Sequence, residues 1–291
     1  MSPDYLVSAL VSVYDSRKFI EGCLDDLLAQ TLYQQDRLEV IIVNTDSPGG
    51  EDAIIRDYVA GCAHFVYLPV PQRESVYAAW NRGIVLARAP FLTSASTDDR
   101  HRPDALELAA DLLEREHAAD PAVALVCYPS YIHSKPNQVW SDRIKYERLY
   151  SGKEDADGFA DNDIGPNPVW WIGLHRTWGL FDATFRGAGD HDFYSMKARQ
   201  THQFKRHPEP LGLWYRDARD KSNLGYLSES ELDRINLHPE PPSPEALARE
   251  WSEWEEKNQA VEILRSPVPT ASENQPPPPR RTGLLGRLFG S

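Results

Sequence analysis

The stretch FLTSASTDDR (residues 91–100) decides the fold prediction, because an apolar run typical of a buried strand stops abruptly at two carboxylates, Asp98 and Asp99. Ligands of α/β proteins bind where parallel strands end. Adjacent carboxylates there repel each other and are costly to desolvate unless a cation or hydrogen-bond donors offset them. A divalent cation that bridges to phosphate oxygens would do so. A solvated loop, or the start of the helix near Pro103, accounts for these residues equally well at this point.

Strand and helix patterns alternate on both sides of this stretch. Apolar, β-branched runs predict strands at residues 6–13, 38–43, 64–68, 91–95 and 123–127. A helical pattern lies between each pair of successive strands, at 19–28, 54–58, 76–86 and 103–113. This alternation predicts crossover units and a mostly parallel central sheet flanked by helices, which is an α/β fold.

The second half of the chain is less regular. Between Tyr128 and Trp171, aromatic, Asn, Asp, Gly and Pro residues predict functional loops. A helix at 190–200 and short strands at 204–207 and 211–215 follow. We therefore expect one large domain at residues 1–235.

Two further segments complete the predicted organisation. Residues 236–265 contain a helix that starts at Ser243-Pro244-Glu245 and should dock on the core through one apolar face, formed by Leu247, Trp251, Trp254, Val261 and Leu264. Residues 266–291 are rich in proline, which predicts a flexible tail, and end in a short basic, amphipathic segment at 280–291. That end could contact a membrane surface or a partner protein peripherally, or simply fray.

Charge and cysteine content narrow the class of protein. The net charge of −13 argues against nucleic-acid binding, which needs a basic face. The three cysteines are widely spaced and predict reduced thiols. There is no signal-peptide pattern and no apolar run long enough to span a bilayer, so we expect a cytoplasmic protein, with peripheral contact at the inner membrane face left open.

Two further segments contain acidic and amide residues that suit ligand binding or catalysis. Asn44 and Asp46 follow the second predicted strand, where they suit recognition of a nucleobase or ribose. Asp190 and Asp192 follow the glycines of RGAGDHDF (186–193), and Asp190 could take a proton from a hydroxyl nucleophile. Turn formation at the first place and helix capping at the second are the competing interpretations.

A cationic segment precedes the fourth predicted strand. Arg73 and Arg82 could face phosphates, and Asn81 adds an amide nearby. Surface ion pairs are the alternative, above all for Arg82. Trp170 could stack on a sugar acceptor, although core packing is the commoner role of tryptophan.

Taken in order, these segments resemble the family 2 glycosyltransferases of GT-A fold, over roughly residues 5–235. Four stretches carry the resemblance: LVSALVSVYDSRKFIEGCLDDLLAQTL, EVIIVNTDSPGGED, YAAWNRGIVLARAPFLTSASTDD and NPVWWIGLHRTWGLFDATFRGAGDHDFYSMKA. The resemblance implies a Rossmann-like GT-A domain that performs inverting transfer of a single sugar from a nucleoside-diphosphate sugar, a UDP-sugar in the first instance. The acceptor would be a glycan or glycoconjugate, and the cofactor Mg²⁺ or Mn²⁺.

The resemblance also implies roles for the residues above. Asp98 would be the metal-binding acid of the family's DxD motif, with Asp99 beside it. Asp190 would be the general base, with Asp192 compensating for Gly189, which stands where the family often has glutamate. Asn44, Asp46, Arg73 and Asn81 would contact the donor.

The chain departs from the family pattern at two acids. Ser96 replaces the first acid of DxD, and Asn44 replaces the usual aspartate of the nucleotide turn. A degenerate member that binds nucleotide or glycan without turnover is therefore the second hypothesis, and a sugar nucleotidyltransferase is the third. The QxxRW motif of processive polymerases is missing, which favours transfer of one sugar.

Overall fold

The computed structural model describes residues 4–141, 148–151, 164–216, 229–237 and 239–267. The helices and strands of the described chain follow in the order β1 (Val7–Val13), α1 (Ile20–Leu28), α2 (Thr31–Gln34), β2 (Leu38–Thr45), α3 (Glu51–Gly61), β3 (Phe65–Val70), α4 (Val76–Leu86), β4 (Phe91–Ser94), β5 (Arg100–His101), α5 (Ala105–Ala119), β6 (Val123–Cys127), β7 (Ser130–His133), β8 (Arg148–Tyr150), β9 (Val169–Trp171), α6 (Gly173–Trp178), η1 (His191–Lys197), η2 (Ala198–Gln200), β10 (Gln203–Arg206), β11 (Gly212–Tyr215), α7 (Glu229–Leu232), α8 (Pro244–Gln259) and β12 (Leu264–Arg265).

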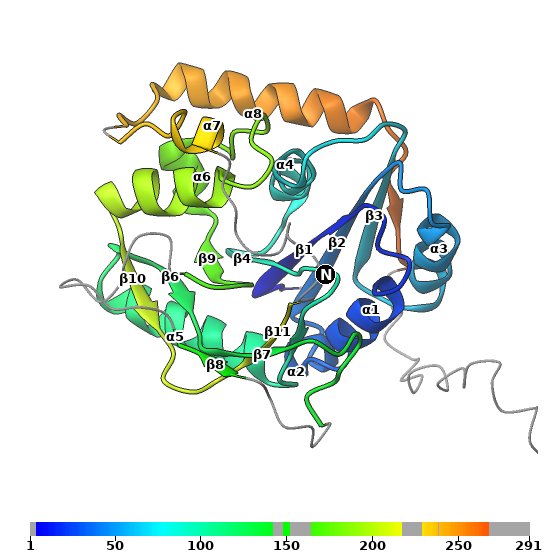
Figure 1. Cartoon of the computed structure of the whole chain (residues 1–291). Coiled ribbons are helices and arrows are strands. Elements are labelled where there is room, and N and C mark those ends of the chain that lie inside the picture. Colours follow the sequence, from blue (N-terminus) through cyan, green and yellow to red (C-terminus); the bar gives the residue numbers. More distant parts are fainter. Residues whose placement is uncertain (1–3, 142–147, 152–163, 217–228, 238, 268–291) are drawn as a thin grey trace, which may run out of the picture.

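The central sheet has the strand order β10-β6-β9-β4-β1-β2-β3-β12 (Figure 1). β1 pairs in parallel with β2 and β4, β2 with β3, and β6 with β10. β9 and β12 pair antiparallel with their neighbours. The predicted mostly parallel α/β sheet is confirmed, and each of the five strands expected in the first half of the chain lies in it.

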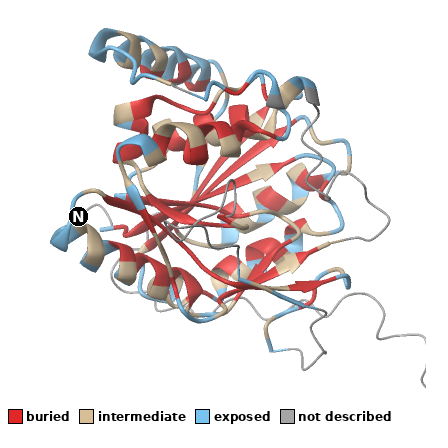
Figure 2. Ribbon diagram, turned by 60° about the vertical axis from the view of Figure 1, so that its left-hand side comes forward, coloured by how far each residue is buried: buried red, intermediate tan, exposed pale blue. Residues whose placement is uncertain are grey.

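Helices cover both faces of this sheet. Because both faces are buried, the sequences of its strands are continuous apolar runs. Along β2, Ile41 and Val43 face the core formed with α4, α6 and α8, whereas Val40 and Ile42 face the core formed with α1, α2, α3 and α5. All four side chains are buried, and the strands of the central sheet are coloured mostly as buried in Figure 2. Burying an aliphatic side chain of this size contributes about 1.5–3 kcal/mol to folding.

The region expected to consist of loops between Tyr128 and Trp171 instead contains three strands, β7, β8 and β9. Each has only three or four residues, too few to show a period of two in the sequence. β9 is inserted antiparallel between β4 and β6, so this segment belongs in part to the central sheet.

A smaller sheet, of order β5-β11-β7-β8, fixes the chain directly after Asp99. The backbone N–H of His101 in β5 donates to the carboxylate of Asp26 on α1, and the His101 ring Nδ1 lies 2.7 Å from the same carboxylate. The buried guanidinium of Arg100 donates to Phe19 O and Asn137 Oδ1. The turn that carries the two carboxylates is thus held from both sheets.

The C-terminal helix forms where the sequence predicts it. Ser243 Oγ accepts a hydrogen bond from Ala246 N, and Trp251 and Trp254 pack into the core over α4 and α6. The helix ends at Gln259, so Val261 and Leu264 do not share its apolar face as expected; Leu264 lies in β12, which pairs with β3 at the edge of the sheet. In the described part of the chain, none of the helices has the length and apolar character required to cross a membrane. The predicted amphipathic end at 280–291 lies outside the described residues.

Candidate active site

A pocket of about 610 Å³ opens at the carboxyl ends of the parallel strands. β1 contributes Ser12, β2 contributes Thr45, and the turn after β4 contributes Asp98. The loops after β3 and before η1 add Arg73 and Arg186. The pocket therefore combines two carboxylates, Asp98 and Glu74, with two guanidinium groups at the place where α/β folds bind ligands.

The two adjacent carboxylates play different parts. Asp98 is half-buried and lines the pocket. Asp99 is buried, and its carboxylate accepts hydrogen bonds from Tyr215 N at 2.9 Å and from Asn167 Nδ2 at 3.2 Å. Burial, with the charge of Asp98 as the next cause, raises the pKa of Asp99 well above its usual value. Both Asp99 oxygens accept hydrogen bonds within the protein, so of the two predicted metal ligands Asp98 is the one that lines the pocket.

Asn167 organises this turn, although it was not among the predicted site residues. Its side-chain oxygen accepts from Ser96 N at 3.2 Å while its amide donates to Asp99. Asn167 has a positive φ of 56°, a conformation that asparagine tolerates better than most residues. The signal in the sequence was the Asn-Pro pair at 167–168, which is typical of a turn.

In the predicted nucleotide turn, Asn44 faces inward. Its amide donates to Tyr67 Oη at 3.0 Å, and its oxygen accepts from Ser47 N at 3.0 Å. Asp46 is exposed, with a φ of 56°. Of this turn, Thr45 is the residue that lines the pocket. Asn44 thus shapes the turn, as the turn-forming interpretation expects.

Arg73 lies in the pocket as predicted. Its guanidinium stacks over the Tyr14 ring, with 4.1 Å between its central carbon and the ring centroid, and both side chains line the pocket. Arg186 joins them from the loop before η1. Planar guanidinium groups of this kind suit the recognition of phosphate.

Asn81 and Trp170 are structural. Asn81 is fully buried; its amide donates to Phe181 O at 2.8 Å and its oxygen accepts from Phe181 N at 3.0 Å, so both polar atoms have partners within the core. Trp170 is 0% exposed, and its indole N–H donates to His175 Nε2 at 3.0 Å. This burial is not compatible with the predicted donor contact of Asn81 or with the predicted sugar stacking of Trp170. Both side chains instead contribute to the core.

Asp190 precedes a π-helix, η1, where the sequence predicted a helix of unspecified kind. Its carboxylate oxygen accepts from Tyr77 Oη at 3.1 Å and from His191 N at 2.9 Å. Burial raises the pKa of Asp190, which these two hydrogen bonds partly oppose. A carboxylate with a raised pKa is a better proton acceptor than an ordinary aspartate.

The departure at Gly189 has a steric reason. A Cβ atom on Gly189 would lie 2.8 Å from the ring of Tyr77, closer than side chains approach one another. Any larger residue at Gly189 would displace the ring that donates to Asp190. Asp192, which was expected to compensate for Gly189, is buried with its carboxylate 2.7 Å from Lys197 Nζ.

The residues of the pocket fit a divalent cation that arrives with a diphosphate. In the described residues, no group of three or more His, Cys, Asp or Glu side chains is arranged to hold a metal ion. The carboxylate of Asp98, with Ser96 and Thr97 beside it in the pocket lining, suits Mg²⁺ or Mn²⁺ that completes its ligands with phosphate oxygens and water.

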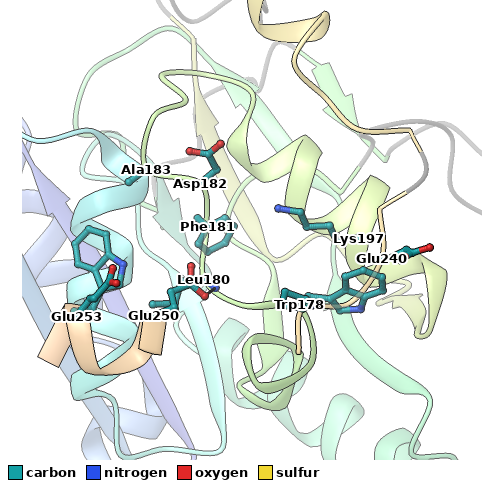
Figure 3. A pocket seen from close by; sticks show the side chains of 11 residues that line it. Trp178, Leu180, Phe181, Asp182, Ala183, Lys197, Glu240, Glu250 and Glu253 are labelled. Carbon is teal, nitrogen blue, oxygen red and sulfur yellow. Dashed lines mark hydrogen bonds between the residues drawn. The ribbon is translucent and has the colours of Figure 1, made fainter. Parts of the chain in front are cut away.

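A second pocket, of about 330 Å³, lies beneath α8 (Figure 3). Its lining is mostly acidic and aromatic, with Lys197 opposite Glu250 and Glu253 of α8. Glu250 accepts a hydrogen bond from Leu180 N, and burial raises the pKa of this acid. None of the predicted site residues lines this pocket.

The model of glycosyl transferase family 2 matches residues 8–167, more than half of the chain. The chain therefore belongs to glycosyltransferase family 2. It is 34% identical to the uncharacterized glycosyltransferase EpsJ of Bacillus subtilis over 94 residues. This matched segment covers 32% of this chain and 26% of that protein. The chain spans about a quarter of the length of the curated Bacillus relatives that it matches.

Two solved structures share the fold. TarS 1-349 of S. aureus, in complex with UDP-GlcNAc, has a TM-score of 0.61 at 15% identity and covers 78% of this chain and 64% of that one. The mannosyltransferase PcManGT of Pyrobaculum calidifontis, in complex with GDP-Man and Mn²⁺, has a TM-score of 0.60 at 17% identity, covering 89% and 73%. These likenesses confirm the GT-A architecture of the chain.

Proposed function

We propose that this protein is an inverting glycosyltransferase that moves a single sugar from a nucleoside-diphosphate sugar to a hydroxyl of a glycan or glycoconjugate. The observation that carries the proposal is the pocket in which the Asp98 carboxylate lies with the guanidinium groups of Arg73 and Arg186, at the carboxyl ends of parallel strands. A diphosphate and its cation require this combination of charges.

The donor would occupy this pocket with its diphosphate near Arg73 and Arg186, and its nucleoside toward Tyr14 and Thr45. The two structural neighbours are in complex with UDP-GlcNAc and with GDP-Man, which supports the nucleotide-sugar class. We favour a UDP-sugar as the donor. The exposed carboxylate of Asp46 is proposed to contact the ribose at the rim.

Asp98 would hold Mg²⁺ or Mn²⁺, which would neutralise negative charge on the leaving diphosphate. Arg73 and Arg186 would act on the same charge from the other elements that line the pocket. Cations that are already in place when charge develops lower the barrier without further rearrangement.

Asp190 would act as the general base. An acceptor hydroxyl oxygen attacks the anomeric carbon on the face opposite the diphosphate, the bond from that carbon to the phosphate oxygen breaks, and the hydroxyl proton passes to Asp190. One such displacement inverts the anomeric configuration. The donation from Tyr77 keeps the Asp190 carboxylate in one orientation while burial keeps it basic. Asp192 would support this role indirectly, through its ion pair with Lys197 on η1.

A transfer assay tests the proposal. The protein is incubated with UDP-, GDP- and dTDP-sugars, Mn²⁺ and a panel of glycan acceptors, with release of nucleoside diphosphate and the anomeric configuration of the product measured by NMR. We expect one donor to be consumed and the product to be inverted. A product of retained configuration would contradict the single displacement.

The second candidate is a binding protein without turnover. It is favoured by Ser96, which replaces an acid, and by Asn44, whose side chain is occupied by Tyr67 and Ser47. Nucleotide binding with no transfer to any acceptor would select this candidate. The third hypothesis, a sugar nucleotidyltransferase, predicts release of pyrophosphate when a nucleoside triphosphate and a sugar phosphate are supplied in place of the donor and acceptor.

We further propose that the protein acts in the cytoplasm, with weak peripheral contact at the membrane through residues 280–291. The segment RRTGLLGRLFGS combines three arginines with apolar residues, which suits an anionic lipid surface. Deleting residues 280–291 should reduce sedimentation with anionic vesicles by about half or more, and leave sedimentation with neutral vesicles unchanged. Equal sedimentation of the two proteins with anionic vesicles would contradict this role.

A further inference from the structure

Glu74 has the wrong charge for a diphosphate pocket. It lies in the pocket lining directly after Arg73 and before Ser75, which caps α4. An uncompensated carboxylate here would repel a diphosphate and compete for the guanidinium of Arg73. Binding of a diphosphate in this pocket therefore requires a positive charge that neutralises the Glu74 carboxylate.

Arg82 provides the neutralising charge. Its Nε donates to Glu74 Oε2 and its Nη2 to Glu74 Oε1, both at 2.7 Å, which makes a bidentate pair. The side chains are 4% and 12% exposed for Arg82 and Glu74 respectively. Gln72 adds a longer hydrogen bond of 3.4 Å to the same carboxylate. A shielded pair of this geometry fixes both the position and the charge of Glu74.

Arg82 is in turn held by the end of α8, about 175 residues later in the chain. Its Nη1 donates to Lys257 O at 2.9 Å and to Asn258 Oδ1 at 3.2 Å. Asn258 Nδ2 donates back to Arg82 O at 2.9 Å, and Asn258 is 1% exposed. In Figure 1, α8 passes over α4, the helix that carries Arg82, and the two helices are in contact.

We propose that α8 positions the donor pocket: Asn258 and the carbonyl of Lys257 hold Arg82, and Arg82 neutralises Glu74 beside the diphosphate. This inference rests on the proposed function. It makes Arg82 and Asn258 positioning residues, and it gives the C-terminal segment a role in donor binding beyond its burial of apolar surface.

The size of the effect follows from electrostatics. Repulsion between unit charges several ångströms apart at a protein surface amounts to about a tenfold change in affinity or more. Removing the Arg82 charge should therefore weaken diphosphate binding about tenfold. Removing the Asn258 side chain, which leaves Lys257 O as an anchor, should weaken it about threefold.

The test is a rescue experiment by calorimetry with UDP and GDP in the presence of Mn²⁺, on the full chain. Arg82→Met and Asn258→Ala are each measured in the wild-type background and in a Glu74→Gln background, where the carboxylate charge is absent. Trp251→Phe is the matched control, because Trp251 anchors α8 in the core, stacked on Arg176, with no part in the Arg82 contacts. Thermal unfolding of every variant is recorded in parallel.

We expect both losses to appear in the wild-type background and to shrink below about twofold in the Glu74→Gln background, with Trp251→Phe less stable but unaltered in affinity. Losses of equal size in both backgrounds would overturn the inference, because they would reflect damage to folding or packing. So would normal binding by Arg82→Met. If Arg82→Met does not fold, the Asn258→Ala pair decides in the same way. A wild-type protein that binds neither nucleotide contradicts the proposed function as well, whereas binding without rescue contradicts this inference alone.

Discussion

The parallel strands carry polar residues at both of their ends, and the two ends differ in the surroundings of these residues. At the amino end, Ser8 of β1 and Glu39 of β2 lie next to the turn before β4. Glu39 is 0% exposed, and its carboxylate accepts from Ser8 Oγ at 2.7 Å and from Arg88 N and Nε at 3.0 and 2.7 Å.

At the carboxyl end of the same strands, Ser12, Thr45 and Asp98 line a pocket. The polar groups at the amino end form a closed hydrogen-bonded cluster within the protein, whereas those at the carboxyl end line a space that a ligand can fill. Each of the following substitutions tests whether this difference separates residues that stabilise the fold from residues that act on a ligand.

The largest effect is expected for Asp190→Asn. Loss of the general base should lower kcat about a thousandfold. The melting temperature should stay the same or rise, because the folded protein no longer contains a desolvated carboxylate with a raised pKa. Steady-state kinetics and calorimetric unfolding measure both quantities.

Asp192→Asn is the matched control for Asp190→Asn, since it removes a neighbouring buried carboxylate that pairs with Lys197. Its kcat should fall by less than about tenfold. An equal loss in the two variants would show that the base assignment is wrong.

Asp98→Ala comes next. It should weaken Mn²⁺-dependent nucleotide binding about a hundredfold, because it removes the carboxylate that faces the cation in the proposed complex. Asp99→Asn should instead leave the Mn²⁺ dependence intact and cost about 1–3 kcal/mol of stability, because its amide would meet the donors of Tyr215 or Asn167. If Asp99→Asn abolishes Mn²⁺-dependent binding, the division between the two acids is wrong.

Arg88→Met tests the opposite end of the strands. It leaves the Glu39 carboxylate buried without its cation, which should lower the free energy of unfolding by about 2–3 kcal/mol. We place the cost at the low end for a buried pair because the Arg88 side chain is 44% exposed. Nucleotide affinity should change by less than about twofold, and a larger change would mean that the two ends are coupled. Urea denaturation and calorimetry give the two values.

The smallest effect is expected for Tyr77→Phe. Asp190 must be ionised to accept a proton, and the hydrogen bond from Tyr77 lowers its pKa. Removing that donor raises the pKa of Asp190 further, so the acid limb of kcat/KM should move to higher pH. An acid limb that stays in place or moves to lower pH would disprove the proposed contribution of Tyr77.

The sequence was most informative where patterns repeat over several residues. The strands and helices of the first half, the α/β class and the placement of Arg73 and Asp98 in the pocket follow from apolar runs that end in polar turns. The strands β7, β8 and β9 are too short to produce a recognisable pattern in the sequence. Trp170 of β9 lies in the core, where it cannot stack on a sugar acceptor.

Single side chains were harder to predict, because a sequence does not show which way they point. Asp98 and Asp99 are neighbours in the chain, yet one faces the pocket and the other faces Tyr215. Asn81 is hydrogen-bonded to Phe181, one hundred residues later in the chain. Arg186 and Glu74 line the pocket from two separate loops. These long-range contacts are set by tertiary packing.

The most direct test is a calorimetric titration of UDP, GDP and their sugar conjugates, with and without Mn²⁺, into the wild-type, Arg88→Met and Asp98→Ala proteins. We predict that one nucleotide binds the wild-type and Arg88→Met proteins with Mn²⁺-dependent affinity, and that Asp98→Ala loses this dependence. Absence of binding to the wild-type protein, or Mn²⁺-dependent binding that survives in Asp98→Ala, would contradict a donor site at the carboxyl end of the strands.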